Sequence, residues 1–250
     1  MWQTFIYGLI ASSALLLGAV IGTYWRPSKR ITGVTLAFSS GTLISALCFE
    51  LFPEAAEQGG FWLSGIGLVA GAGAFVLLDA WLDRMAAPKA GPEEPQERKV
   101  VQEASRGVGL SLLAGVTLDG IPENLALGVS IASGLSLPLL VAIFASNLPE
   151  ALVGANAMRD AKRSKRFIIG IWTATTILLT LATVGGDAIG ESLSPEMLSL
   201  LLSFSGGAVL ASLADTLMPE AFEHGKPWNA FGTAAGFFIS FVLAHQGAGG

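Results

Sequence analysis

The sequence predicts an all-α polytopic membrane protein with eight transmembrane helices, and three observations carry this prediction. The 250-residue chain is 52% hydrophobic and only 13% charged, and its mean hydropathy is +0.62, far from the composition of soluble domains. Apolar stretches of about 20 residues, the length that crosses a bilayer, recur along the chain. The lysines and arginines gather in alternate connections between these stretches.

We expect the transmembrane helices at about residues 3–24, 31–53, 61–81, 108–131, 137–158, 167–188, 197–219 and 228–245. All 14 basic residues then follow helices one, three, five or seven, so the positive-inside rule makes those loops cytoplasmic. Both termini would lie outside the cytoplasm, in an integral protein of the plasma (inner) membrane. Loop 86–105 combines prolines with charges of both signs, which predicts a flexible cytoplasmic segment.

The first three spans carry few groups with chemistry of their own. Span 3–24 has neither a basic n-region nor a cleavage pattern, so we expect it to be retained. The one cysteine, Cys48, excludes an intrachain disulfide and is expected to pack inside its apolar run. Small residues at helical spacing in the third span predict close approach to a neighbouring helix. These residues are Gly65, Gly67, Gly71 and Gly73.

The fourth span contains two acids at a depth where a bilayer disfavours ionised groups. Asp119 and Glu123 are four residues apart, so they share one helix face. Pro122 has no amide hydrogen, so it kinks the helix and releases the carbonyl of Leu118 from its usual partner. Ionisable groups at such a depth mark ion pathways or ligand sites. We therefore predict a cation site with Asp119 and Glu123 among its ligands.

The fifth span repeats this device at a similar depth. Pro149 and Glu150 repeat the proline and glutamate of the fourth span, and Ser146 and Asn147 precede Glu150 by about one helical turn. Antiparallel packing of the two spans would bring their glutamates together half-way across the bilayer. The alternative is a pair of structural kinks whose acids are neutralised by neighbouring groups. The predicted metal site consists of Asp119, Glu123, Glu150, Asn147 and Ser146, with helix kinks at Pro122 and Pro149.

Spans two and seven are related by an internal repeat. Both contain Phe-Ser-x-Gly, starting at Phe38 and Phe204, and both end in Pro-Glu-Ala-x-Glu, starting at Pro53 and Pro219. The two spans enter the membrane from opposite sides in the predicted topology, so the repeat is inverted, as in many transporters. We expect a 3+2+3 arrangement, with helices 1–3 and 6–8 as inverted repeats around kinked helices 4 and 5.

The same inversion would place acids at both mouths of a pathway. The predicted outer mouth carries Glu50 and Glu54, and the predicted inner mouth carries Asp215 and Glu220. For Glu54 and Glu220, a plain position in headgroup water at a helix end is an equal alternative. Glu50 and Asp215 lie about one turn deeper, which favours a role in the pathway.

Together these motifs resemble the ZIP family of divalent metal transporters. That family carries His-Asn-x-Pro-Glu-Gly in its fourth helix and His-x-x-Pro-Glu-Gly in its fifth. Here Asp119 and Ser146 take the histidine positions, and Asn124 takes the place of the fourth helix's final glycine. The resemblance covers essentially the whole chain. It implies a homodimeric transporter of divalent cations of the zinc, iron or manganese class, with a carboxylate-lined site between helices 4 and 5.

The departures from the family motifs leave the metal open. The family often adds a glutamate from helix six, whereas the sixth span here has threonines and no carboxylate before Asp187, so a second metal is not expected. Zinc favours nitrogen and sulfur donors, while oxygen donors suit manganese, magnesium or calcium, with iron(II) intermediate. Because the histidines are lost, a metal-binding sensor or non-transporting relative is the alternative function.

Other function classes find little support in the sequence. The basic residues form no stripe for nucleic acid. No serine has a histidine or lysine at membrane depth to activate it, and no glycine-rich phosphate loop precedes a helix. We therefore expect no enzyme and no organic cofactor. The expected partners are the metal ion as substrate, the lipid bilayer and a second copy of the chain.

Overall fold

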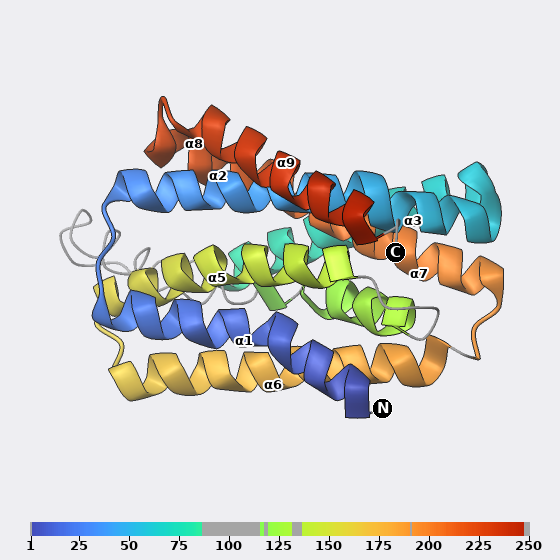
Figure 1. The fold of residues 1–250 in the computed structure, drawn as a ribbon. Coiled ribbons are helices and arrows are strands. Elements are labelled where there is room, and N and C mark those ends of the chain that lie inside the picture. The colour runs from blue at the N-terminus through green and yellow to red at the C-terminus, as the bar shows by residue number, and fades with distance from the viewer. Residues whose placement is uncertain (1, 87–115, 118–119, 132–136, 191, 248–250) are drawn as a thin grey trace.

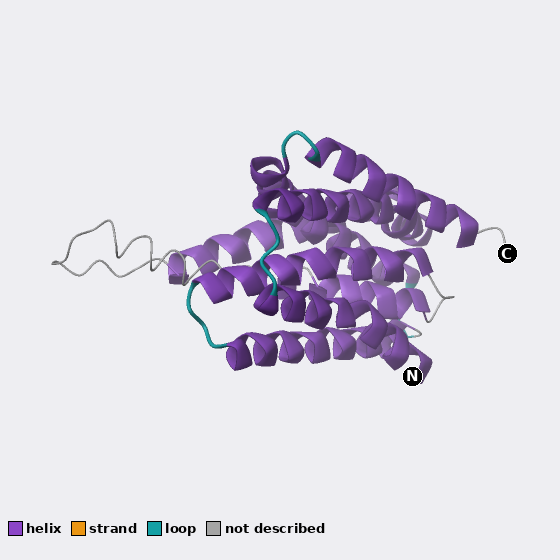
Figure 2. Cartoon of the chain, turned by 60° about the vertical axis from the view of Figure 1, so that its left-hand side comes forward, coloured by secondary structure: helices purple, strands orange, loops and turns teal. Residues whose placement is uncertain are grey.

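The computed structural model describes residues 2–86, 116–117, 120–131, 137–190 and 192–247, and every regular element in these ranges is helical. Figures 1 and 2 show long helices packed side by side and joined by short loops. The predicted all-α class is therefore confirmed for the described residues. Leu118, Asp119 and all of loop 86–105 except Ala86 lie outside them.

The helices follow the chain in the order α1, α2, α3, α5, α6, α7, α8 and α9, with two π-helical segments, η1 and η2, inside longer helical runs. Their bounds are α1 Trp2–Tyr24, α2 Lys29–Ala46, η1 Leu47–Leu51, α3 Phe52–Ala86, α5 Leu137–Asp160, α6 Lys165–Gly190, α7 Pro195–Ser212, η2 Leu213–Leu217, α8 Met218–Gly225 and α9 Asn229–Gly247. Residues 120–131, between α3 and α5, are also helical.

Several of these helices are long and apolar enough to cross a membrane. Among the described residues, five stretches meet this condition by length and composition: Trp2–Tyr24, Lys29–Trp81, Leu139–Asp160, Lys165–Gly190 and Pro195–Gly225. Large apolar side chains such as Phe61, Leu77 and Phe231 lie exposed on the outer faces of α3 and α9. An apolar surface of this kind is what lipid tails cover, so the chain is an integral membrane protein.

The stretch from Lys29 to Trp81 is one helical run with a break in it. Gly60 adopts φ 76° and ψ 166°, a non-helical conformation inside α3. This left-handed region favours glycine because a Cβ atom would be strained there. The sequence predicted separate helices ending near Pro53 and beginning near Phe61, and the break at Gly60 lies between those positions.

The internal repeat reappears as repeated local structure. Ser28 and Ser194 cap α2 and α7, and each side chain accepts a hydrogen bond from the backbone N–H three residues later. Each helix then passes into a π-helical segment, η1 after α2 and η2 after α7. Equivalent caps and equivalent π segments make the two runs structural counterparts over more than the matching motifs.

Equivalent glycines also make equivalent contacts in the two repeats. A Cβ atom on Gly41 would overlap the Thr233 carbonyl of α9, and one on Gly207 would overlap the Leu68 carbonyl of α3. Within α3, Gly67 and Gly71 pack closely on α7, as predicted for this span. For Gly65 and Gly73 the described residues do not bear the prediction out, because none of them lies within 4 Å of a Cβ built on either residue. Those two glycines lie off the α7 face.

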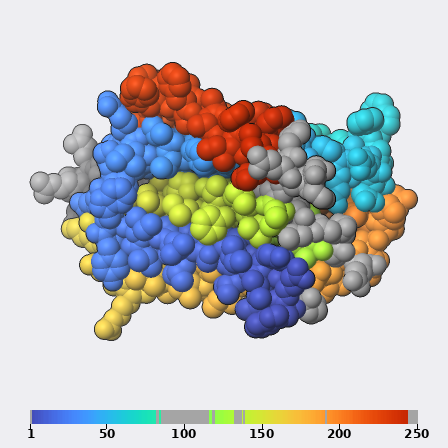
Figure 3. Space-filling view, viewed as in Figure 1, coloured from blue at the N-terminus to red at the C-terminus, as the bar shows by residue number. Residues whose placement is uncertain are grey.

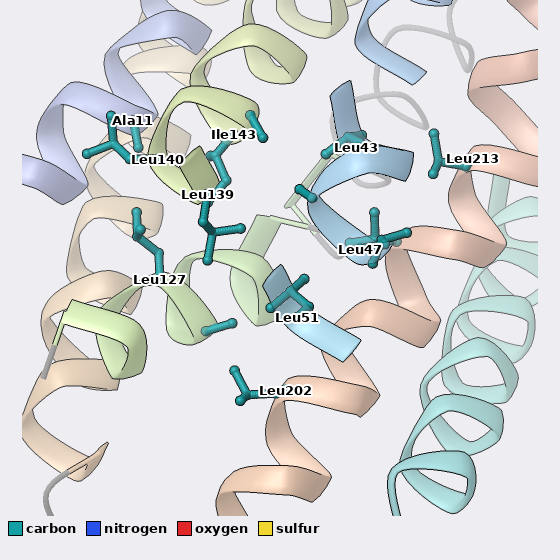
Figure 4. Packing of buried hydrophobic residues seen from close by; sticks show 14 of the residues in the cluster. Ala11, Leu43, Leu47, Leu51, Leu127, Leu139, Leu140, Ile143, Leu202 and Leu213 are labelled. Atoms are coloured by element: carbon teal, nitrogen blue, oxygen red, sulfur yellow. The ribbon is translucent and has the colours of Figure 1, made fainter. Parts of the chain in front are cut away.

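The helices pack in two groups that meet along one interface. In the first group, α1 packs on α5 and α6; in the second, α3 packs on α7 and α2 packs on α8 and α9. Helix α5 also contacts α2 and α9, and Figure 3 shows it as a strip between α1 and α2. A buried apolar cluster fills this interface, with Leu139 and Ile143 of α5 facing Leu43 and Leu47 (Figure 4).

The cysteine does not lie where the sequence predicted. Cys48 is exposed in η1 instead of packed in the interior. Cys48 and Phe49 face outward between the buried Leu47 and Leu51, and a lipid-facing side chain must be as apolar as a core side chain. Hydropathy alone therefore cannot separate the two positions in a membrane protein.

Candidate metal site

The two predicted glutamates are both buried in the described structure. Glu123 lies on helical segment 120–131 and is 6% exposed, and Glu150 lies on α5 and is 9% exposed. Helix α5 continues through Pro149 from Leu137 to Asp160. Acidic side chains are seldom buried to this extent unless they pair or bind a cation.

Two asparagines link the two Pro-Glu motifs to the same point of α1. Asn124, which follows Glu123, accepts a hydrogen bond from Ser12 Oγ of α1 at 3.3 Å. Asn147 donates from Nδ2 to the Ala11 carbonyl of the same helix at 3.4 Å. Ala11 and Ser12 are neighbours on α1, about 1.5 Å apart along its axis. Both motifs therefore meet α1 at one level.

Asn124 joins three helical elements through its side chain. Its Oδ1 atom accepts hydrogen bonds from Ser12 of α1 and from Thr183 of α6, the latter at 3.1 Å, and its Nδ2 donates to the Gly120 carbonyl at 2.9 Å. The one hydroxyl hydrogen of Thr183 is shared between Asn124 and the Leu179 carbonyl, 3.2 Å away. Asn124 thus holds segment 120–131 in place by turning its amide oxygen towards α1 and α6. Its position beside Pro122-Glu123 was the only sequence signal for this role.

Each glutamate lies on the same helix face as residues of the buried apolar cluster between the two groups. Glu123 lies one turn before Ala126 and Leu127, which belong to the interface cluster. Glu150 lies two turns after Ile143, another member of that cluster, and one turn after Ser146. Both acids therefore lie on helix faces that also carry members of this cluster, which draws further residues from α1, α2 and α7.

Ser146 and Asn147 present oxygen atoms that can serve as ligands. Ser146 is 1% exposed and donates its hydroxyl hydrogen to the Ile143 carbonyl at 3.0 Å, which leaves the lone pairs of Oγ. Asn147 is also 1% exposed, and its amide donates to α1. In each residue a hydrogen bond from the donor group fixes the orientation of the oxygen.

The described part of the site consists of oxygen donors alone. Among the described residues, no three side chains of His, Cys, Asp or Glu come together closely enough to hold a metal. The third predicted carboxylate, Asp119, lies outside those residues. Two carboxylates, one hydroxyl and one amide oxygen suit a hard or intermediate divalent cation.

The four predicted mouth residues lie in or beside the π segments. Glu50 belongs to η1 and Asp215 to η2, and Glu50 is half-buried while Asp215 is exposed. Glu54 opens α3 and is half-buried. In α8, a carboxylate oxygen of Glu220 lies 3.7 Å from Nε2 of His224.

Comparison with known proteins points to membrane transporters. The chain is 29% identical over 230 residues to the zinc transporter ZupT of Escherichia coli O7:K1 (strain IAI39 / ExPEC) and to that of Escherichia coli (strain K12 / DH10B), with 87% of this chain and 86% of each relative covered. No protein-family model matches the chain. The relatives are transporters by name, which agrees with the expectation that the chain is not an enzyme.

Proposed function

We propose, from the premise that this chain is related to the ZIP family of divalent metal transporters, that it carries a divalent cation across the plasma (inner) membrane. The ion would bind between helices 4 and 5, at Asp119, Glu123, Glu150, Asn147 and Ser146. The observation that supports this site best is the shared level of the two Pro-Glu pairs on α1, through Asn124 and Asn147. Two buried glutamates at one depth form a site that a cation would stabilise.

We propose eight spans in the inverted 3+2+3 arrangement. In such a chain, spans that are both odd-numbered or both even-numbered run in the same direction. The described contacts agree: first with fifth, second with eighth, third with seventh and fourth with sixth are parallel neighbours. In each pair, two successive glycines of one span lie on two residues of the other whose numbers rise in the same order. These contacts are Gly18 and Gly22 on Leu148 and Leu152, Gly232 and Gly236 on Val34 and Phe38, Gly67 and Gly71 on Leu200 and Phe204, and Gly120 and Gly128 on Leu179 and Thr183.

The first and sixth spans supply the antiparallel counterpart. Thr4 Oγ1 donates to Asp187 at 2.6 Å, and Gly8 lies against Thr183, so α1 and α6 run in opposite directions. With the basic loops in the cytoplasm, both termini lie outside. Glu50 and Glu54 then belong to the outer mouth, and Asp215 and Glu220 to the inner mouth.

The metal is proposed to be of the zinc, iron or manganese class. The relatives are named zinc transporters, which favours zinc. The oxygen donors Glu123, Glu150, Ser146 and Asn147 favour a harder ion. The transporter would work as a homodimer, as the family resemblance implies.

Uptake of metal into proteoliposomes tests this function. Wild-type protein should move manganese or zinc inward, and Glu123→Gln or Glu150→Gln should abolish uptake because a carboxylate ligand is lost. The matched control is Glu57→Gln, since Glu57 is an exposed acid of α3 and should keep its uptake. Folding of the variants should survive, because removing one of two repelling buried charges relieves the metal-free protein.

The outcomes separate the transporter from the alternative. Wild-type rates in both glutamate variants would overturn the site. Metal binding by the wild type without flux would favour the sensor or non-transporting relative.

A further inference from the structure

Two buried serine hydroxyls stand without a hydrogen-bond partner at equivalent positions of the repeat. Ser39 of α2 and Ser205 of α7 are each the serine of a Phe-Ser-x-Gly motif, and each is 0% exposed. Neither Oγ atom has a hydrogen-bond partner among the described residues. Burying a hydroxyl without a hydrogen-bond partner lowers the stability of the fold, and the repeat contains such a hydroxyl at two equivalent positions.

Neighbouring serines on the same helices show that a buried serine hydroxyl can find a hydrogen-bond partner there. Ser40, next to Ser39, donates to the Leu36 carbonyl at 2.9 Å. Ser203, two residues before Ser205, donates to the Ser199 carbonyl at 2.6 Å. Both neighbours satisfy their hydroxyls one turn back along their own helix, the usual choice for a serine in an apolar helix.

The two unpartnered serines lie on the interface side of their helices. Ser39 falls between Leu36 and Leu43, three residues after one and four before the other. Ser205 falls in the same way between Leu202 and Val209. All four apolar neighbours belong to the buried cluster that also contains residues of α5 and segment 120–131.

The other unpartnered buried groups lie elsewhere. Ser45 Oγ and Trp172 Nε1 also have no partner among the described residues. Ser45 is four residues after Gly41, on the side of α2 that packs against α9. Trp172 belongs to a separate cluster formed with α1 and α5. Of these four described groups, only Ser39 and Ser205 have neighbours in the cluster that also contains Ala126, Leu127 and Ile143, the residues one or two turns from Glu123 and Glu150.

We propose that Ser39 and Ser205 are contact points for the transported cation in its partly hydrated form, one hydroxyl in each repeat. A divalent ion on oxygen ligands keeps part of its water shell, and a metal-bound water is a strong donor to a serine oxygen. Each hydroxyl would hold that shell as the ion leaves the central glutamates towards one side of the membrane. This inference rests on the proposed transport function and adds two residues that the Pro-Glu motifs do not contain.

The test compares each serine with its satisfied neighbour in purified, full-length protein. Proteoliposomes carrying Ser39→Ala, Ser205→Ala or both are assayed for manganese and zinc uptake beside Ser40→Ala and Ser203→Ala. We expect Ser39→Ala and Ser205→Ala to lower the maximal rate roughly tenfold or more, since a hydrogen bond to a charged partner is lost. The concentration for half-maximal uptake should stay unchanged, and the controls should match the wild type.

A melting measurement supplies a second readout that needs no transport. Without metal, Ser39→Ala should melt at or above the wild-type temperature, because an unsatisfied hydroxyl is removed. Added manganese should then raise its melting temperature less than it raises that of the wild type.

The outcomes for the two proposals differ. Uptake and metal-induced stabilisation of Ser39→Ala and Ser205→Ala that equal those of Ser40→Ala and Ser203→Ala would overturn the role of the serines. The transport function would stand in that case if Glu123→Gln still lost uptake. Failure of the wild type to take up or bind either metal would overturn both.

Discussion

At the scale of single residues, Asn124 joins three helical elements through its side chain. Its side chain binds α1 through Ser12, α6 through Thr183 and its own segment through Gly120. We expect Asn124→Ala to lower the free energy of unfolding by about 1–3 kcal/mol, because Ser12 loses its acceptor in a buried place. Thermal unfolding in detergent measures this effect.

Thr173→Ala is the control for that measurement. Among the described residues, the Thr173 hydroxyl bonds only the Ile169 carbonyl of its own helix, so its removal should change the melting temperature little. Equal melting temperatures for the two variants would show that Asn124 does not join the helices.

At the scale of elements, close glycine contacts hold the repeats together. A methyl group at Gly207 would overlap the Leu68 carbonyl, and one at Gly41 would overlap the Thr233 carbonyl. Each change to alanine should force its helix away from its neighbour and cost roughly 1–3 kcal/mol of stability. Gly73→Ala is the matched control, since no described residue lies near its Cβ position. A Gly207→Ala protein as stable as Gly73→Ala would contradict this packing.

Part of this element structure could be read from the sequence. Apolar length and low charge predict an all-α membrane protein, and the structure and the relatives confirm this class. The motifs Pro122-Glu123 and Pro149-Glu150 carry the predicted resemblance to divalent metal transporters, and the relatives are named zinc transporters. Proline and acid at membrane depth are local signals, visible without a partner helix.

Other features depend on partners and could not be read. Ser39 and Ser40 are adjacent serines, and only the packing of α2 shows that Ser39 lacks a hydrogen-bond partner among the described residues. Gly71 and Gly73 are likewise two glycines of α3, and only the structure shows that Gly71 is the one that faces α7. The role of Asn124 requires knowing that α1 and α6 lie beside it.

At the scale of the whole molecule, the inverted repeat predicts accessibility from opposite sides. Single cysteines replacing Glu50 and Asp215, in a Cys48→Ala background, should be labelled by membrane-impermeant reagents from opposite faces. Metal should change the two labelling rates in opposite directions, because a population shifted towards one mouth closes the other. Labelling of both positions from one face would refute the inverted repeat.

The π-helical segments have a consequence for how the two repeats should respond to mutation. An i→i+5 turn takes one residue more than an α turn, so the angular phase of the helix slips by about 100° across it. In a scan of substitutions along α2 and into α3, sensitivity to substitution should recur with a 3.6-residue period up to Ala46. From Phe52 onward the same period should return, shifted by one residue, and an equal shift should occur across Leu213–Leu217. Sequence alignments that assume an unbroken period would assign Glu54 and Glu220 to the wrong face.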